Sequence, residues 1–338
     1  MGSLRTRLII LTAICVLAIG GATGYLVHSR SHQESAVRNA KPVDQTALAK
    51  VVNVPHIVFR NTALGSKYGM VGMVSLADPD GPRALTSTAC DRVYAAMRKY
   101  VCLASNRGIA TTYSAHVLAA DLKPAQTLPL TGIPSRARMS RDASLAATTS
   151  FTAGDSYAGT SFSTRTVVTN VGGATYGSLE DFTLIHNGQS IKPVDRNYWG
   201  VTFAADDNTF YATVEWSKRT WLVRGDLAAR KIVTLHEDAE CPSLSPDGKN
   251  IVYKQRGNLA TGQWRLVEYA IDTGHITPLS ETRSVDDQVE WLDNGHVIYG
   301  LPRTGSQAAI DDVWSARSDG KGRPKVLIPQ AWSPAVVR

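Results

Sequence analysis

The feature that most constrains the fold is the stretch "PSLSPDGKNIVY" at residues 242–253, where two short apolar strands flank a turn built on Pro246-Asp247-Gly248. Turn residues placed between two apolar strands are typical of a β-hairpin. Related stretches recur along the chain, around Asp142, Asp206 and Asn294 and, in a weaker form, at "YAAMRKYVCLA". The hairpin is therefore one copy of a repeated unit, and the repeat decides the architecture.

A second kind of hairpin follows each copy of the first. Its turn residue recurs every 43 to 56 residues, at Asp78, Asp121, Asn170, Asp226, Asp272 and Asp319. A leucine follows each turn at a similar offset, at Leu85, Leu130, Leu179, Leu235, Leu279 and Leu327. Two hairpins per repeat give four strands, whose alternating apolar positions present one face to the neighbouring unit.

The two ends of the repeat region each hold part of a unit. "AWSPAVVR" at 331–338 matches a first strand, whereas the segment that begins "HIVFRN" at residue 56 matches the second to fourth strands. Together they make one unit, which predicts an all-β, six-bladed β-propeller over residues 51–338, closed by pairing of the N- and C-terminal strands. An open solenoid would instead need polar capping repeats at its ends.

The motif "PSLSPDGKNIVY", with its four-strand period, resembles the TolB-type (PD-x-G) propeller repeat of bacterial envelope proteins. The run from "VDDQVEWLDNGHVIYGLP" through "DVWSARSDG" to "SPAVVR" is similar to an actinobacterial, membrane-anchored TolB-like subgroup. The resemblance covers nearly all of residues 51–338. It implies a propeller outside the cytoplasm and does not by itself imply a reaction.

An apolar stretch of twenty uncharged residues, 8–27, is long enough to cross a bilayer. Arg5 and Arg7 precede it, so residues 1–7 are expected to be a cytoplasmic tail and 8–27 a single-pass anchor in the cell membrane. Residues 28–50 are polar and aperiodic, as in a flexible stalk. The alternative is a signal peptide that is cleaved to release a secreted domain. In both cases the propeller lies outside the cytoplasm.

The net charge of +7 is concentrated near the N-terminus, next to the apolar stretch. This distribution favours a membrane surface as a partner and argues against nucleic acid, because no clustered basic face is visible. Cys90 and Cys102 bracket a predicted hairpin, and an oxidising compartment favours a disulfide between them over two unpaired core thiols. Cys241 is then a single buried thiol.

Motifs for catalysis and for cofactor binding were sought in the sequence. G-x-S-x-G, H-E-x-x-H, Walker A and G-x-G-x-x-G do not occur, and no C-x-x-C spacing indicates a zinc site. His28 and His32 are four residues apart, as ligands on one helix face would be, but they are interpreted as part of the flexible stalk. We therefore predict no catalytic residue, metal or cofactor. The oligomeric state is not predicted.

Ligand sites of propellers usually lie at a mouth of the central channel, where the segments that enter the innermost strands converge. In this chain those segments offer charged and aromatic side chains. The candidates for ligand or partner binding are Arg92, Arg136, Arg196, Tyr198, Trp199, Glu240, Asp286 and Asp287, with Asp91, Arg138 and Glu290 beside them. The alternative for each is an inter-blade salt bridge or a solvated loop. Residues 149–178, rich in Gly, Ser and Thr, predict an elongated hairpin or loop in the third blade, with a disordered insertion as the alternative.

Two functions fit this sequence. The favoured one is a non-catalytic, membrane-anchored binding or scaffold module for a protein or another cell-envelope component. The alternative is a propeller enzyme, a lyase or hydrolase acting on a glycan or peptide at the channel mouth. An enzyme requires titratable groups with opposed roles in one pocket, and the candidate face offers Asp286 and Asp287 for this.

Overall fold

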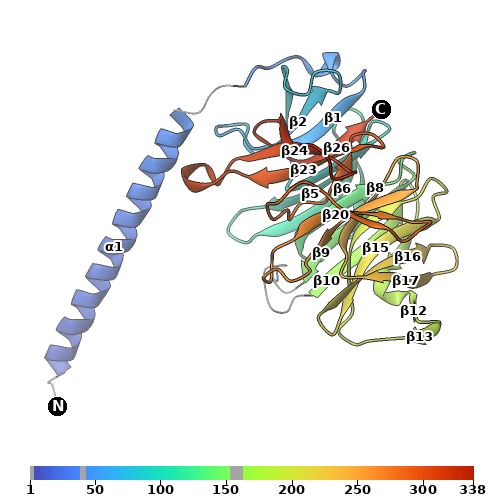
Figure 1. Ribbon diagram of the computed structural model, residues 1–338. Helices are drawn as coiled ribbons and strands as arrows, with labels where there is room; N and C mark the ends of the chain where they lie inside the picture. Colours follow the sequence, from blue (N-terminus) through green and yellow to red (C-terminus); the bar gives the residue numbers. More distant parts are fainter. Residues whose placement is uncertain (1–3, 39–42, 153–162) are drawn as a thin grey trace. The chain divides into compact units, whose positions relative to one another are not determined.

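The structure is a computed structural model in which residues 4–38, 43–152 and 163–338 are described (Figure 1). The chain divides into two compact units. One contains the helix α1 (Leu4–Arg38), and the other contains the sheets.

The helix α1 is longer than the predicted anchor, because it continues through residues 28–38 of the predicted stalk. No helix in the described part of the chain combines the length and the apolarity that a membrane span requires. The predicted transmembrane anchor is thus not supported.

The described strands form six sheets, five of four strands and one of six. We call these sheets blades 1 to 6. Blade 1 consists of β26 (Ala331–Val337), β1 (His56–Asn61), β2 (Met70–Ser75) and β3 (Ala84–Ala89). Blade 2 consists of β4 (Arg92–Ala96), β5 (Lys99–Asn106), β6 (Thr112–Leu118) and β7 (Pro124–Leu128). Blade 3 consists of β8 (Ile133–Met139), β9 (Leu145–Thr152), β10 (Ser163–Asn170) and β11 (Thr175–Ser178).

The remaining blades follow the same order along the chain. Blade 4 consists of β14 (Asn197–Phe203), β15 (Thr209–Trp216), β16 (Arg219–Asp226) and β17 (Lys231–Glu237), with β12 (Thr183–His186) and β13 (Gln189–Ile191) added at its outer edge. Blade 5 consists of β18 (Glu240–Leu244), β19 (Asn250–Gln255), β20 (Arg265–Ala270) and β21 (Ile276–Pro278). Blade 6 consists of β22 (Glu290–Trp291), β23 (His296–Pro302), β24 (Asp311–Arg317) and β25 (Lys325–Ile328).

The first strands of the blades contact one another in a ring. β4 contacts β8, β8 contacts β14, β14 contacts β18, β18 contacts β22, β22 contacts β26, and β26 contacts β4. Blade 1 is assembled from both ends of the repeat region, because β26 pairs antiparallel with β1, with Ile57 opposite Val336 and Asn61 opposite Ala331 (Figure 1). The architecture is a six-bladed, all-β propeller.

The blades are held together by apolar clusters between neighbouring sheets. The pattern follows from the period of two along a strand, as β5 shows. Tyr100 and Cys102 pack into the cluster shared with blade 1, whereas Val101 and Leu103 pack into the cluster shared with blade 3. Further clusters join blades 3 and 4, 4 and 5, 5 and 6, and 6 and 1. Each sheet therefore buries both faces, which explains why so many strands are apolar at successive positions.

The recurring Asp of the first hairpin has a local role. Asp247 Oδ1 accepts hydrogen bonds from Ser245 Oγ at 2.6 Å and from the Lys249 amide at 3.1 Å. Asp142 makes the same pair of contacts, to the Ser140 hydroxyl and the Ser144 amide. A carboxylate at this position satisfies turn amides that the ladder leaves unpaired, so these aspartates stabilise turns.

Three segments outside the regular repeat complete the fold. Residues 43–50 lie against blade 1 rather than forming an irregular stalk, because Gln45 bridges to Arg83 and the 3₁₀ helix η1 (Leu48–Lys50) follows. Cys90 and Cys102 are joined by a disulfide across the entry to blade 2, and Cys241 is a buried free thiol. The η3 turn (Gly305–Gln307) connects β23 to β24.

The surplus length near blade 3 has two locations. β9 and β10 form a long hairpin, but its connection, residues 153–162, lies outside the described residues. The rest follows β11, where η2 (Leu179–Asp181) leads into the β12–β13 hairpin. β12 pairs parallel with β17, so this hairpin extends blade 4 and not blade 3.

Candidate functional site

The segments that enter the innermost strands bring five of the predicted site residues together. Asp286 is the centre of this network. Its Oδ1 lies 2.9 Å from Lys254 Nζ and 3.3 Å from Arg136 Nη2, and its carbonyl accepts from the same Arg136 nitrogen at 2.8 Å. Burial alone would raise the pKa of Asp286, but the cations of Lys254 and Arg136 outweigh it and lower that pKa to about 2.

Asp287 lies beside this pair but has a different environment. It is 1 % exposed, its Oδ2 accepts from the Gly300 amide at 3.0 Å, and its Oδ1 lies 3.5 Å from Arg92 Nη1. Burial raises the pKa of Asp287, and the Arg92 cation offsets this only in part. The pKa values of these two adjacent carboxyl groups thus shift in opposite directions, because two cations outweigh burial at Asp286 and burial outweighs the cations at Asp287.

Glu240 joins the network through Trp264, whose indole Nε1 donates to Glu240 Oε1 at 2.8 Å. The ammonium of Lys254 lies 4.1 Å from the centre of the Trp264 ring, and its side chain is fully buried. Burial raises the pKa of Glu240 despite this cation. Lys254 and Trp264 were not predicted, because a lysine within a β19 strand and a tryptophan in a loop carry no signal of their own.

The other three predicted residues do not join this network. Arg196 holds the loop before β14, donating to the carbonyls of Pro193 and Glu180. Tyr198 is fully buried in the cluster between blades 3 and 4. Trp199 is 1 % exposed and packs with Phe151 and Cys241. These two aromatic side chains are core residues because β14 is buried on both faces.

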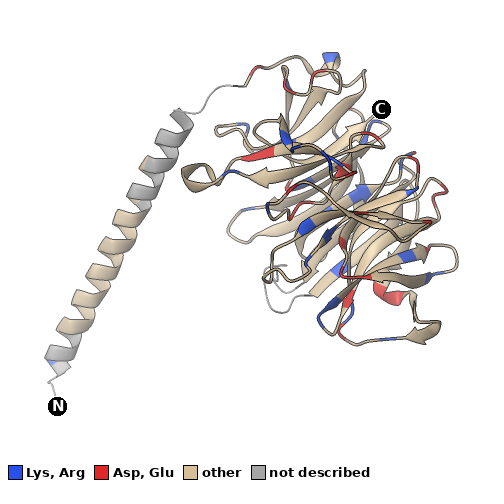
Figure 2. Ribbon diagram, viewed as in Figure 1, with Lys and Arg blue, Asp and Glu red and all other residues tan. Residues whose placement is uncertain are grey.

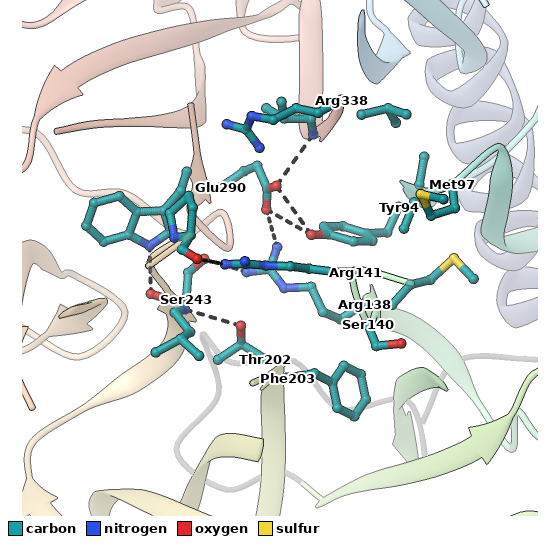
Figure 3. Close-up of a pocket in the computed structure, with 18 residues that line it drawn as sticks. Tyr94, Met97, Arg138, Ser140, Arg141, Thr202, Phe203, Ser243, Glu290 and Arg338 are labelled. Atoms are coloured by element: carbon teal, nitrogen blue, oxygen red, sulfur yellow. Dashed lines mark hydrogen bonds and ion pairs between the residues drawn. The ribbon is translucent and has the colours of Figure 1, made fainter. Parts of the chain in front are cut away.

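A cavity of about 290 Å³ opens at the opposite end of the innermost strands (Figure 3). Its walls come from the C-terminal ends of β4, β8, β14, β18, β22 and β26, so every blade contributes. We call it the Glu290 cavity, after the carboxylate at its floor. Arg138 and Glu290 in its lining were named from the sequence beside the candidates, but the other residues of this cavity were not, because the candidates came only from the segments that enter the innermost strands.

The floor of the Glu290 cavity is a cluster of four side chains from four blades. Arg138 Nη1 donates to Glu290 Oε2 at 2.5 Å, and Arg138 Nη2 donates to Ser243 Oγ at 2.6 Å. Tyr94 Oη donates to both Glu290 oxygens, at 3.3 and 3.2 Å. In Figure 3 these groups point toward one another across the channel. Both members of the Arg138–Glu290 pair are buried.

The electrostatics of this floor are those of a desolvated ion pair. Burial raises the pKa of Glu290, and the Arg138 cation opposes the shift. Burial and the adjacent Glu290 carboxylate also raise the pKa of Tyr94, which keeps its phenol protonated as a donor. Arg138 and Glu290 have opposite charges in the sequence, but 152 positions separate them, so only closure of the ring brings them together.

The rim and walls of the Glu290 cavity are mainly apolar, with two cations at the edge. Phe203 and Trp291 form buried walls, and Met97 is 63 % exposed at the tip of the β4–β5 hairpin. Arg141 donates to the carbonyls of Ser245 and Pro246, and Arg338 to that of Leu292. Elsewhere on the propeller, basic and acidic residues are interspersed over the blades (Figure 2).

No group of three or more potential metal ligands occurs among the residues that the structure describes. Comparison of the sequence with protein-family models and with curated proteins finds no match. Comparison of the fold does find similar structures. TolB from Acinetobacter baumannii superposes with a TM-score of 0.56 at 16 % identity, covering 84 % of this chain and 67 % of that one.

The fold is that of a TolB-like six-bladed β-propeller. A chain from a nidogen/laminin complex is similar as well, with a TM-score of 0.55 at 10 % identity over 83 % of this chain and 98 % of that one. At these identities the likeness concerns the fold alone. What the propeller of this chain binds therefore depends on its own side chains.

Proposed function

We propose that the chain is a non-catalytic, protein-binding scaffold whose Glu290 cavity receives an exposed segment of a partner protein. The observation that carries the proposal is a mouth built by all six blades, with apolar walls around a floor that is already hydrogen-bonded internally. Apolar pockets at the centre of a polar surface are where protein partners insert their anchor side chains. The similar fold within a nidogen/laminin complex supports a protein-binding role.

The size of the cavity favours part of a macromolecule over a whole small molecule. Its volume of about 290 Å³ is at the lower end of the range of roughly 300–1,000 Å³ for small-molecule pockets. It fits one or two side chains of a segment that continues over the rim. The exposed Met97 at the rim suits this role, because its flexible thioether adapts to a partner surface.

The floor chemistry supports binding rather than catalysis. Ser243 Oγ accepts from the guanidinium of Arg138, and an arginine cannot take a proton from a serine hydroxyl. A serine nucleophile needs a neighbouring base, which this contact does not supply. Glu290 is held by Arg138 and Tyr94, so its lone pairs are engaged in structure.

We also propose that the propeller works outside the cytoplasm and that α1 associates with the cell membrane, the location predicted from the sequence. The Cys90–Cys102 disulfide supports an oxidising compartment. Apolar side chains along α1, including Ile9, Leu11 and Leu17, are more than half exposed and would be covered by lipid. We further propose that the β26–β1 pairing is what closes the ring.

The binding proposal is tested by site-specific photocrosslinking of the full chain in intact cells. A crosslinking residue at Met97 is expected to give a discrete adduct with a protein. The same residue at Val194, which is fully exposed outside the cavity, serves as the matched control and should give none. In copurification, Met97→Glu should lose the crosslinked partner and Val194→Glu should retain it. Adducts at both positions, or none at Met97, would refute the proposed site.

The location is tested by fractionation of the same cells. The membrane fraction is expected to contain the full chain, whereas removal of residues 1–42 should release it into the soluble fraction. External protease should reach the propeller in cells whose outer layers are permeabilised. Recovery of the full chain in the cytosolic fraction would contradict the proposed location.

A further inference from the structure

A second cavity, of about 400 Å³, lies at the other end of the innermost strands. It is lined by the beginnings of β4 and β8, whereas the Glu290 cavity is lined by the ends of the same strands. We call it the arginine cavity, because Arg60, Arg92 and Arg107 reach it from three separate segments. Its apolar wall is formed by Trp332, Ile133 and Pro134.

The cations of this cavity are incompletely neutralised. Among the described residues, no carboxylate lies within ion-pair distance of Arg60 or Arg107. Arg60 instead lies over the Tyr68 ring, 4.9 Å from its centre, and Arg107 is exposed. Arg92 lies near both Asp287 and Trp332: its Nη1 is 3.5 Å from Asp287 Oδ1, and its Cζ is 5.6 Å from the centre of the Trp332 ring.

Two aspartates line the cavity as well, but only one is engaged. Asp91 Oδ2 accepts from the Ser105 amide at 2.7 Å. The Asp311 carboxyl accepts no hydrogen bond among the described residues, although the backbone of Asp311 exchanges two with Thr62 Oγ1. The lining therefore carries three positive and two negative groups, and the carboxyl group of Asp311 is the negative group that accepts no hydrogen bond among the described residues.

The groups around Asp311 raise the pH at which its carboxyl group ionises. Burial and the Asp287 carboxylate raise the pKa of Asp311 to about 6, with Asp312 adding to the shift and Arg60 and Arg92 opposing it. Below that pH the side chain is neutral and can donate a hydrogen bond. The excess of positive charge in the cavity then rises from one to two.

We propose that the arginine cavity is a binding site for a small organic carboxylate, held by Arg60, Arg92 and Arg107, with the rest of the ligand against Trp332. A guanidinium fork matches the two oxygens of a carboxylate. The wall is held in place because Gly300 lies under the Trp332 ring, so close that a Cβ there would come within 2.3 Å of it. This site is separate from the Glu290 cavity, and its failure would leave the protein-binding proposal intact.

The test uses the purified full chain, with sodium glucuronate as the probe and glucose as its neutral counterpart, in calorimetric titrations. Glucuronate is expected to bind with a dissociation constant on the order of 1 mM or tighter, and glucose should not bind. Affinity should rise roughly fivefold between pH 7.5 and 5.5, the effect of one neutralised charge a few ångströms away in a wet site. Equal binding of glucose, or no saturable binding of glucuronate, would overturn the proposal.

Three variants separate the site from general electrostatics. Arg107→Gln should weaken glucuronate binding about tenfold, whereas Arg323→Gln, at an exposed arginine outside the cavity, should leave it unchanged. Asp311→Asn removes no side-chain hydrogen bond and should bind at pH 7.5 as the unmodified chain binds at pH 5.5, with no further gain on acidification. Equal loss in the two arginine variants, or an unchanged pH dependence in Asp311→Asn, would refute the assignment.

Discussion

Arg138 in blade 3 and Glu290 in blade 6 form a buried ion pair across the central channel, with Nη1 and Oε2 2.5 Å apart. Tyr94 and Ser243 add hydrogen bonds from blades 2 and 5. One pair thus ties four of the six blades together where the innermost strands end. Because both charges are out of water, the pair matters most when one member is removed.

Arg138→Met should lower the free energy of unfolding by about 3–5 kcal/mol, since it leaves the Glu290 carboxylate buried without its cation. The double variant Arg138→Met/Glu290→Leu should lose less than Arg138→Met alone, because no unpaired charge remains. Urea unfolding of the set measures both values. For comparison, Arg219→Ala breaks the exposed pair with Glu237 and should leave the free energy of unfolding nearly unchanged. A double variant no more stable than Arg138→Met would contradict this account.

Asp286 predicts a loss of stability in acid. Its folded-state pKa of about 2 lies below the value of about 3.9 for an unfolded Asp. A depressed pKa means that the ionised group stabilises the fold above pH 4, and that this contribution disappears as the pH falls toward 2. Its side chain is half exposed, so solvent limits the contribution to about 1 kcal/mol. The urea midpoint should therefore fall between pH 4 and 2 by more in the unmodified chain than in Asp286→Asn. Equal pH profiles of the urea midpoint in the two proteins would rule out this contribution of Asp286.

Reduction of the Cys90–Cys102 disulfide should destabilise the propeller by about 2–3 kcal/mol, because the bond closes a short loop in the unfolded chain. Thermal unfolding with and without dithiothreitol measures the effect. The variant Cys90→Ala/Cys102→Ala should be destabilised to a similar degree and should not respond to the reductant. Cys15→Ser, which removes a free thiol, should behave as the unmodified chain does. A response to dithiothreitol in the double variant would point to another thiol.

Gly200→Ala should be among the most damaging single changes in β14. Gly200 has a φ of +67°, and an added Cβ would come within 2.6 Å of the Cys241 Cα in the next blade. We expect a loss of more than about 2 kcal/mol, from backbone strain plus displacement of β18. Gly172, with a φ of +83° and open space around it, isolates the strain component in Gly172→Ala. If the two variants lose equal stability in urea, the close approach of the blades carries no cost.

The fold was accessible from sequence because its determinants are local. The recurring Asp and Asn residues of both hairpins lie in turns or end the strands beside them, and the alternation of Tyr100 to Leu103 shows the period of two along β5. The helix α1 was predicted only in part, because it continues beyond the apolar stretch 8–27 to Arg38, and no helix among the described residues meets the length and apolarity of a membrane span. The β12–β13 addition to blade 4 was also missed, because its parallel pairing with β17 has no signature in the chain.

The site was only partly accessible, because its contacts join residues far apart in the chain. Arg92, Arg136, Glu240, Asp286 and Asp287 were found because polar residues gather where the innermost strands begin. Burial explains the residues that were predicted wrongly or not at all. Tyr198 and Trp199 lie in the core, whereas the buried Lys254 forms an ion pair with Asp286. Which face of β14 or β19 a side chain occupies depends on strand register. Register depends in turn on the neighbouring strands, whose pairing cannot be read from the local sequence.

Blade 1 has a consequence for the order of assembly. Its innermost strand, β26, lies 275 residues after the start of β1, its partner. Until residues 331–337 have been synthesised, β1 has an unpaired edge, and the cluster of Ile57 and Phe59 with Ala331 and Val336 cannot form. A growing chain therefore carries an unfinished sheet through most of its synthesis. The ring therefore becomes a single rigid body only after its last strand has been made.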